Sequence, residues 1–145
     1  MLDIKRVNSK DGFEDAFSIR TEVFVREQNV PEEIELDEYD KTAEHVVAYL
    51  DNKPVGCGRL ILNGKKARIG RVAVLKVNRK SGVGKSICIE LMKIAAEKGA
   101  ESFVLDAQIT AAGFYKKLGF TEVGEKFMEA GIEHIQMVKE HNDYI

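Results

Sequence analysis

The chain has 145 residues, which is the length of one domain and is enough to bury a hydrophobic core. Hydrophobic residues make up 44% of it and charged residues 32%, a balance that argues against a disordered chain. The formal net charge of −2 argues against a nucleic-acid partner, because general nucleic-acid-binding proteins are usually strongly basic. We therefore expect one folded domain over residues 1–145.

The two cysteines, Cys57 and Cys88, are too few for a disulfide framework, and both lie in apolar stretches. We interpret them as reduced core residues. The first residues, Met1 to Lys5, contain no apolar signal region, and no apolar run approaches the ~20 residues that cross a bilayer. The sequence therefore predicts a cytoplasmic protein without a membrane partner.

Hydrophobic patterning in the first third of the chain predicts a strand followed by helix. Residues 2–7 alternate as a strand does, and apolar residues recur at helical spacing over about residues 11–27, as one helix or two short ones. Residues 29–42 break this pattern. Six carboxylates between Glu32 and Asp40 predict an acidic loop or a short frayed helix there.

The rest of the chain alternates between strand and helix patterns. Strands joined by hairpin turns are expected at 46–50, 55–62 and 67–77, followed by a helix from Val83 to Lys98. The later predicted elements are a strand at 103–105, a helix at 110–118, and hairpin strands at 120–128 and 132–138. This order predicts a mixed α/β (α+β) domain with helices on both faces of a mostly antiparallel sheet.

One strand contains a slip in its alternation. Ala67 and Ile69 share a face, whereas Val72 and Val74 continue on the opposite parity, and Gly70 lies at the slip. A glycine within a strand often marks a bulge, which turns backbone N–H groups away from the ladder and leaves them free for a ligand. The alternative interpretation is a strand buried on both faces.

Two glycines, Gly82 and Gly84, open the helix that follows this strand. A helix N-terminus has about four unpaired N–H groups and a partial positive charge, and glycines let an anion approach the backbone closely. Together with the nearby Arg79, Lys80 and Lys85, these residues predict a pyrophosphate cradle. An ordinary turn between strand and helix is the alternative.

Two nucleotide-binding motifs are excluded by the same segment. The Walker loop requires a glycine five residues before its Gly-Lys pair, and that position is Arg79. The dinucleotide fingerprint requires a third glycine, and that position is Ile87.

The chain resembles the GCN5-related N-acetyltransferases (GNAT) over nearly its whole length. Residues 71–84 resemble motif A of that family, with the pattern Arg71-Val72-Ala73-Val74 followed by Arg79-x-x-Gly82-x-Gly84. A second stretch resembles motif B, with the pattern Gln108-x-x-Ala111-x-x-Phe114-Tyr115-x-x-x-Gly119-Phe120. The pattern Arg20-x-x-Val23-Phe24-Val25-x-Glu27-Gln28-x-Val30-Pro31 also resembles a small bacterial subgroup.

This resemblance implies the GNAT acyl-CoA N-acyltransferase fold, with a six- to seven-stranded sheet. It implies acetyl-CoA as cosubstrate, a small-molecule or peptide amine as acceptor, and direct attack of that amine in a ternary complex; no metal is expected. The residues implied to bind the carrier are Val72, Ala73, Val74, Arg79, Lys80, Ser81, Gly82, Val83, Gly84, Lys85, Gln108, Ala111 and Phe114. The chain could also form a homodimer.

Tyr115 stands at the position of the family's general acid, where its hydroxyl would donate to the leaving sulfur. The alternative is a buried aromatic residue on a short helix. Two departures from the family pattern are visible: motif B often begins with Asn where this chain has Gln108, and residues 65–78 contain no carboxylate. The candidates for a base on the substrate side are therefore Glu22, Glu27, His45 and His134, each of which could instead be structural.

The acidic run from Glu32 to Asp40 lies where the family places a substrate-side loop, so its charge could attract a cationic amine. A solvated loop is the alternative. Two other function classes stay open: a non-catalytic acyl-CoA-binding or regulatory module, favoured by the absent strand carboxylate, and a protein-interaction domain without a ligand.

Overall fold

The computed structural model describes residues 1–140, so the last five residues of the expected domain, 141–145, lie outside the described residues. Seven strands form one sheet in the order β1-β2-β3-β4-β5-β7-β6. All neighbours are antiparallel except β4 and β5, which are parallel. The strands are Leu2–Val7 (β1), Glu44–Leu50 (β2), Lys53–Asn63 (β3), Lys66–Val74 (β4), Ser102–Gln108 (β5), Thr121–Glu129 (β6) and Ile132–Glu140 (β7).

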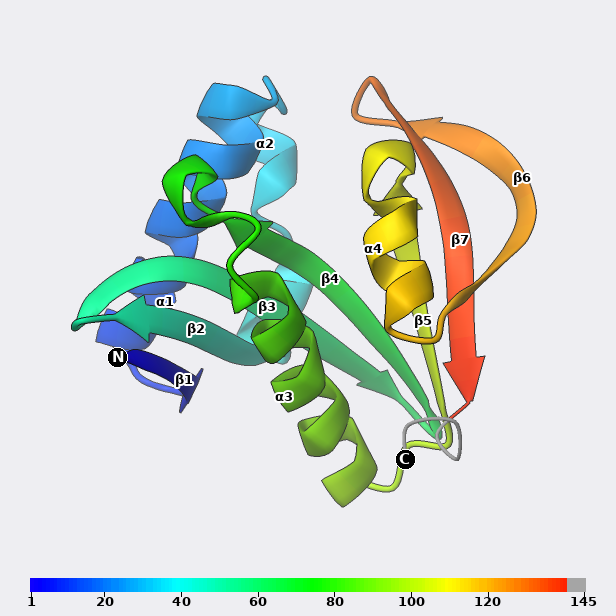
Figure 1. The fold of residues 1–145 in the computed structure, drawn as a ribbon, viewed down its shortest axis with the longest axis horizontal. Coiled ribbons are helices and arrows are strands. Elements are labelled where there is room, and N and C mark those ends of the chain that lie inside the picture. Colours follow the sequence, from blue (N-terminus) through cyan, green and yellow to red (C-terminus); the bar gives the residue numbers. More distant parts are fainter. Residues whose placement is uncertain (141–145) are drawn as a thin grey trace.

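Helices lie on both faces of the sheet, with α1 on one side and α3 on the other (Figure 1). The mixed α/β class and the mostly antiparallel sheet are thereby confirmed. The α-helices are Lys10–Arg20 (α1), Glu32–Glu35 (α2), Val83–Glu97 (α3) and Ala112–Lys117 (α4). The shorter helical segments are a π-helix, Thr21–Glu27 (η1), and three 3₁₀ turns, Glu38–Lys41 (η2), Lys76–Asn78 (η3) and Ile109–Ala111 (η4).

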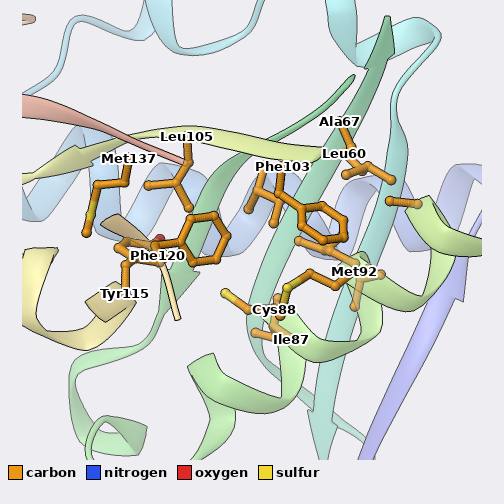
Figure 2. Packing of buried hydrophobic residues seen from close by; sticks show 14 of the residues in the cluster. Leu60, Ala67, Ile87, Cys88, Met92, Phe103, Leu105, Tyr115, Phe120 and Met137 are labelled. Atoms are coloured by element: carbon orange, nitrogen blue, oxygen red, sulfur yellow. The ribbon is translucent and has the colours of Figure 1, made fainter. Parts of the chain in front are cut away.

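Two hydrophobic cores follow from strand alternation, one on each face of the sheet. Val46 and Ala48 of β2 belong to the core under α3, whereas Val47 between them packs with Ala16 and Ile19 of α1. Figure 2 shows the larger core, where Ile87, Cys88 and Met92 of α3 lie against the sheet. Both cysteines are free and buried, as expected, and burial raises the pKa of each thiol to about 12.

Two glycines of β3 set how closely α3 approaches the sheet. A Cβ on Gly56 would lie 2.9 Å from Cδ1 of Ile87, and a Cβ on Gly58 would lie 2.8 Å from Cγ2 of the same side chain. Neither position has room for a side chain. The close approach holds the first turns of α3 beside the end of β4.

One predicted element differs from the structure. The predicted strand to residue 77 is wrong, because β4 ends at Val74 and the chain then turns into η3, where the Asn78 N–H donates to the Leu75 carbonyl at 2.8 Å. Residues 29–42 contain two short helices, α2 and η2. Within residues 1–140, no helix has the length and apolar character needed to cross a membrane.

Candidate functional site

A β-bulge interrupts the pairing of β3 with β4. Cys57 pairs with Ala73 and Arg59 pairs with Gly70, so β4 has one residue more than β3 between these pairs. The predicted bulge is therefore confirmed. The residue with left-handed backbone is Arg71, with φ 51°, whereas a Cβ on Gly70 would meet nothing within 4 Å.

The parallel strands β4 and β5 form a V. They pair only over residues 66–68 and 102–104, and beyond that point each strand continues unpaired with the other (Figure 1). The opening is a cleft of about 770 Å³. Six predicted carrier-binding residues line it, namely Val72, Ala73, Val74, Arg79, Gln108 and Ala111.

The loop after β4 ends at an uncapped helix N-terminus. Gly82 precedes α3 with φ 87° and contributes no capping side chain, and the Ser86 N–H is the first to bond back, to the Gly82 carbonyl at 3.1 Å. The N–H groups of Val83, Gly84 and Lys85 therefore have no partner within the helix. A Cβ on Gly82 would meet nothing within 4 Å, so an anion can approach these amides.

The remaining predicted carrier-binding residues, 80–85 and Phe114, are not part of the cleft lining. Phe114 is nevertheless close to the loop, because a Cβ on Gly84 would lie 3.3 Å from its Cζ. Contact of α4 with the first turn of α3 places both predicted motifs at the same end of the V.

Arg79 is held by two partners. Its Nε donates to the Val74 carbonyl at 2.8 Å, and its two Nη atoms donate to the Glu27 carboxylate at 2.7 Å each. The hydrogen bond from Arg79 lowers the pKa of Glu27. Glu27, predicted as a base, is therefore an ionised partner of Arg79. Glu22, the other helical candidate, pairs with Arg26 at 3.0 Å and does not line the cleft.

The two histidine candidates lie in different places. His45 is buried outside the cleft, where its Nε2 donates to the Asp40 carbonyl at 2.9 Å and its ring packs edge-on against Phe13. Burial lowers the pKa of His45, so the structure gives it a structural position. His134 lines the cleft, and its Nδ1 lies 2.7 Å from the Ile132 carbonyl. Because a carbonyl only accepts, Nδ1 donates this hydrogen bond, and Nε2 lies 3.8 Å from Oε2 of Glu129, which also lines the cleft.

Tyr115 joins the core and the cleft. The residue is 9% exposed and lines the cleft, and its ring packs edge-on against Phe114 and Phe120. Figure 2 shows Tyr115 beside Phe120 in the core. Burial raises the pKa of Tyr115 far above its ordinary value, so the phenol stays protonated at neutral pH. Tyr115 is therefore a buried aromatic residue whose hydroxyl can still donate a proton, so the two interpretations of this residue do not exclude each other.

Half of the acidic run is paired with buried arginines. Arg20 is 1% exposed and donates to Glu35 at 2.6 Å and to Asp40 at 2.7 Å. Arg59 donates to Asp37 at 2.7 Å and to Asp40 at 2.9 Å. We refer to Arg20, Arg59, Arg71, Glu35, Asp37 and Asp40 as the arginine–carboxylate cluster.

The bulge residue Arg71 completes this cluster. Its Nη2 donates to the Glu35 carbonyl at 2.9 Å and to Asp37 at 3.2 Å. Three positive charges thus face three negative ones, which leaves only Glu32, Glu33 and Glu38 as exposed carboxylates of the run. The expectation that all six carboxylates attract an amine is therefore corrected, and so is the solvated-loop alternative.

The cluster could have been suspected from Arg20, because an arginine in an apolar helical stripe needs a buried partner. A second feature had no signal in the sequence. The side-chain amides of Gln28 and Gln108 meet across the cleft, where Gln108 Nε2 donates to Gln28 Oε1 at 2.8 Å and the reverse bond measures 3.4 Å. Within the described residues, no group of three or more His, Cys, Asp or Glu is placed to hold a metal ion.

Comparison with known proteins identifies one family. Residues 6–141 match the family model described as an acetyltransferase (GNAT) domain. The chain is 47% identical over 133 residues to the "Uncharacterized N-acetyltransferase YjcF" of Bacillus subtilis, an alignment that covers 91% of this chain and 95% of the relative.

Solved structures agree with this match. Escherichia coli ElaA superposes with a TM-score of 0.86 at 26% identity, covering 97% of this chain and 100% of that one. An acyl-CoA N-acyltransferase from Pseudomonas aeruginosa also gives a TM-score of 0.86, at 27% identity, with 96% and 99% covered.

Proposed function

The chain belongs to the GNAT acetyltransferase family, and from this premise we propose that it transfers the acetyl group of acetyl-CoA to a primary amine by direct attack in a ternary complex. The observation that carries the proposal is the open V between β4 and β5, which leads to the uncapped N-terminus of α3. An extended strand-like arm and a diphosphate fit these two features. We further propose that residues 1–145 act as one cytoplasmic domain.

The carrier-binding groups are mostly backbone. We assign the diphosphate to the N–H groups of residues 80–85, where the helix dipole and the exposed Lys80 and Lys85 favour an anion. The pantetheine arm would pair with Val72 and Val74, beside the bulge. An N–H of the same strand would donate to the thioester carbonyl and hold the developing oxyanion, a contribution of about 2.7–4 kcal/mol to the barrier.

The attacking amine must lose a proton before it reacts. With a pKa near ~10, about one primary amine in a thousand is neutral at pH 7. We assign His134 as the base, because it alone of the four candidates lines the cleft. The neutral amine nitrogen forms a bond to the thioester carbon, one proton of that nitrogen moves to Nε2, and the carbon–sulfur bond breaks with its electron pair leaving on sulfur.

The leaving sulfur needs a proton donor. Tyr115 meets this need, since burial keeps its hydroxyl protonated and the residue lines the cleft on the side of motif B. Its hydroxyl would donate to the thiolate as the carbon–sulfur bond breaks. The acceptor would be a small-molecule or peptide amine, entering past the arginine–carboxylate cluster on the opposite wall.

The proposal is tested in two steps. Millimolar acetyl-CoA should raise the melting temperature, because a ligand that binds only the native state stabilises it by mass action. A thiol-release assay with acetyl-CoA and a panel of amines should then give amine-dependent release of CoA; propionyl-CoA in parallel tests the choice of acyl group. Absence of any thermal shift would overturn the proposal.

A second function is favoured by one observation. Residues 65–78 hold no carboxylate, so the bulged strand supplies no base. A non-catalytic acyl-CoA-binding module would keep the thermal shift but give no thiol release with any amine.

The oligomeric state is a separate question. Light scattering of the protein as it elutes from a size-exclusion column would show whether the chain forms a homodimer.

A further inference from the structure

Two consecutive residues at the end of the π-helix η1 contact both arms of the V. Glu27 pairs with Arg79, which follows β4, and Gln28 pairs with Gln108, the last residue of β5. The partners are 52 and 80 residues away in sequence. We refer to Glu27 and Gln28 as the strap.

The Glu27 contact fixes the β4 arm. A carboxylate and a guanidinium joined by two parallel bonds form the most directional ion pair available to these side chains. Since the remaining Nε of Arg79 donates to the Val74 carbonyl, Glu27 is tied through one guanidinium to the last residue of β4. The loop that leads to Gly82 begins at this braced arginine.

The Gln28 contact fixes the β5 arm. The stronger bond runs from Gln108 Nε2 to Gln28 Oε1 at 2.8 Å, and both side chains are partly buried. A primary amide has two N–H donors and two acceptor lone pairs, so each glutamine keeps capacity for a further partner.

The π-helical turn places the strap. The Gln28 N–H donates to the Val23 carbonyl at 3.1 Å, a bond that spans five residues rather than four. One residue fewer in this turn would rotate the following side chains by about 100° around the helix axis. Glu27 and Gln28 would then no longer face Arg79 and Gln108.

We propose that Glu27 and Gln28 are positioning residues, which hold the two arms of the V at the separation that the acyl carrier requires. This inference rests on the proposed function. Glu27 accordingly acts through Arg79 and is not the base. A strap that served only to fasten η1 to the sheet would affect stability and leave carrier affinity unchanged.

The experiment measures coenzyme A affinity by calorimetry on folded variants of the full chain. Gln28→Leu and Gln108→Leu should each weaken binding about three- to tenfold, the value of one hydrogen bond. The double variant should be no weaker than the worse single variant, because the two residues act as a pair.

The contact between Glu27 and Arg79 is tested with a separate control variant. Glu27→Gln should weaken coenzyme A binding about threefold or more and raise KM for acetyl-CoA with a smaller effect on kcat. Glu14→Gln removes an exposed carboxylate of α1 that lies 4.0 Å from Lys10, and it should change neither value.

The outcomes separate the two proposals. A wild-type chain that does not bind coenzyme A would overturn the proposed function itself. A wild-type chain that binds, together with Gln28→Leu and Glu27→Gln variants of equal affinity, would overturn the strap alone. Additive losses in the Gln28→Leu/Gln108→Leu double variant would also contradict it, since independent residues give additive effects.

Discussion

The Arg20 guanidinium and the Asp40 carboxylate form two hydrogen bonds, at 2.7 and 3.1 Å, inside the protein. The pair joins α1 to the segment that carries α2 and η2, and that segment supplies Glu35 and Asp37 to the wall of the cleft. An acidic run that would otherwise be solvated is thereby folded against the sheet. The shape of this wall depends on paired charges rather than on a hydrophobic face.

Removing the Arg20 side chain should first unfold the segment that carries α2 and η2, which forms this wall of the cleft. Arg20→Met leaves Glu35 and Asp40 buried without their main partner, and breaking a buried ion pair from one side costs about 3–5 kcal/mol. Urea unfolding followed by circular dichroism measures this loss. Arg26→Met, which removes an exposed arginine one turn and a half further on, should change stability by less than about 1 kcal/mol. Equal losses in the two variants would contradict the buried role of Arg20.

Stability should fall in acid because of Asp40. Burial by itself would raise the pKa of this carboxyl, but hydrogen bonds from Arg20, from the Asp37 backbone and from Arg59 lower it to about 2. Because the pKa of Asp40 is lower in the folded protein, its ionised carboxylate stabilises the fold at any pH above the unfolded-state pKa of about 3.9. This stabilisation is lost as the pH falls toward 2. The free energy of unfolding should therefore decrease between about pH 4 and pH 2. Asp40→Asn should flatten this dependence, and an unchanged slope would contradict it.

Tyr115→Phe tests the proton donor. The variant keeps the ring that packs on Phe114 and Phe120, so folding and coenzyme A affinity should be unchanged. Loss of a general acid should lower kcat about 100-fold or more. Because burial raises the pKa of Tyr115 far above its ordinary value, the wild-type rate should show no loss from this group up to about pH 10. An unchanged kcat at saturating amine would remove Tyr115 from the mechanism.

His134→Ala tests the base. His134 faces Gln108 across the β5–β7 ladder, and removal of its ring opens the cleft wall without touching the α3 N-terminus. We expect kcat to fall about 100-fold with coenzyme A affinity retained. His45→Ala provides the contrast: it removes a ring buried outside the cleft, so melting temperature should fall while turnover per folded molecule stays the same.

The local features of the site could be predicted from the sequence because each depends on a few neighbouring residues. Gly82 indicated the start of α3, and the change of alternation near Gly70 indicated the bulge. The left-handed backbone at the bulge could not be predicted in the same way, because it falls on Arg71, whose side chain bonds to the Glu35 carbonyl and to Asp37, and not on the glycine beside it. Tertiary contacts override the local preference there.

The sequence does not indicate which of two similar residues on distant segments reaches the cleft, or which of them pair. His45 and His134 each stand alone on a strand, yet only the face of the sheet and the neighbouring strand decide which one reaches the cleft. Gln28 and Gln108 carry no motif that links them, and their pairing depends on one π-helical turn. Periodicity identifies which elements form, but it does not give the distances between them.

The most direct test of the carrier site compares the two glycines that flank α3, Gly82 before it and Gly99 after it. Gly82 and Gly99 have φ of 87° and 86°, and a Cβ on either would meet nothing within 4 Å, so Gly82→Ala and Gly99→Ala should lose similar stability, about 1–2 kcal/mol each. Only Gly82 lies at the N-terminus of the helix. Calorimetry with coenzyme A should show affinity about tenfold or more weaker for Gly82→Ala and unchanged for Gly99→Ala. Equal affinities for the two variants would contradict diphosphate binding at this helix.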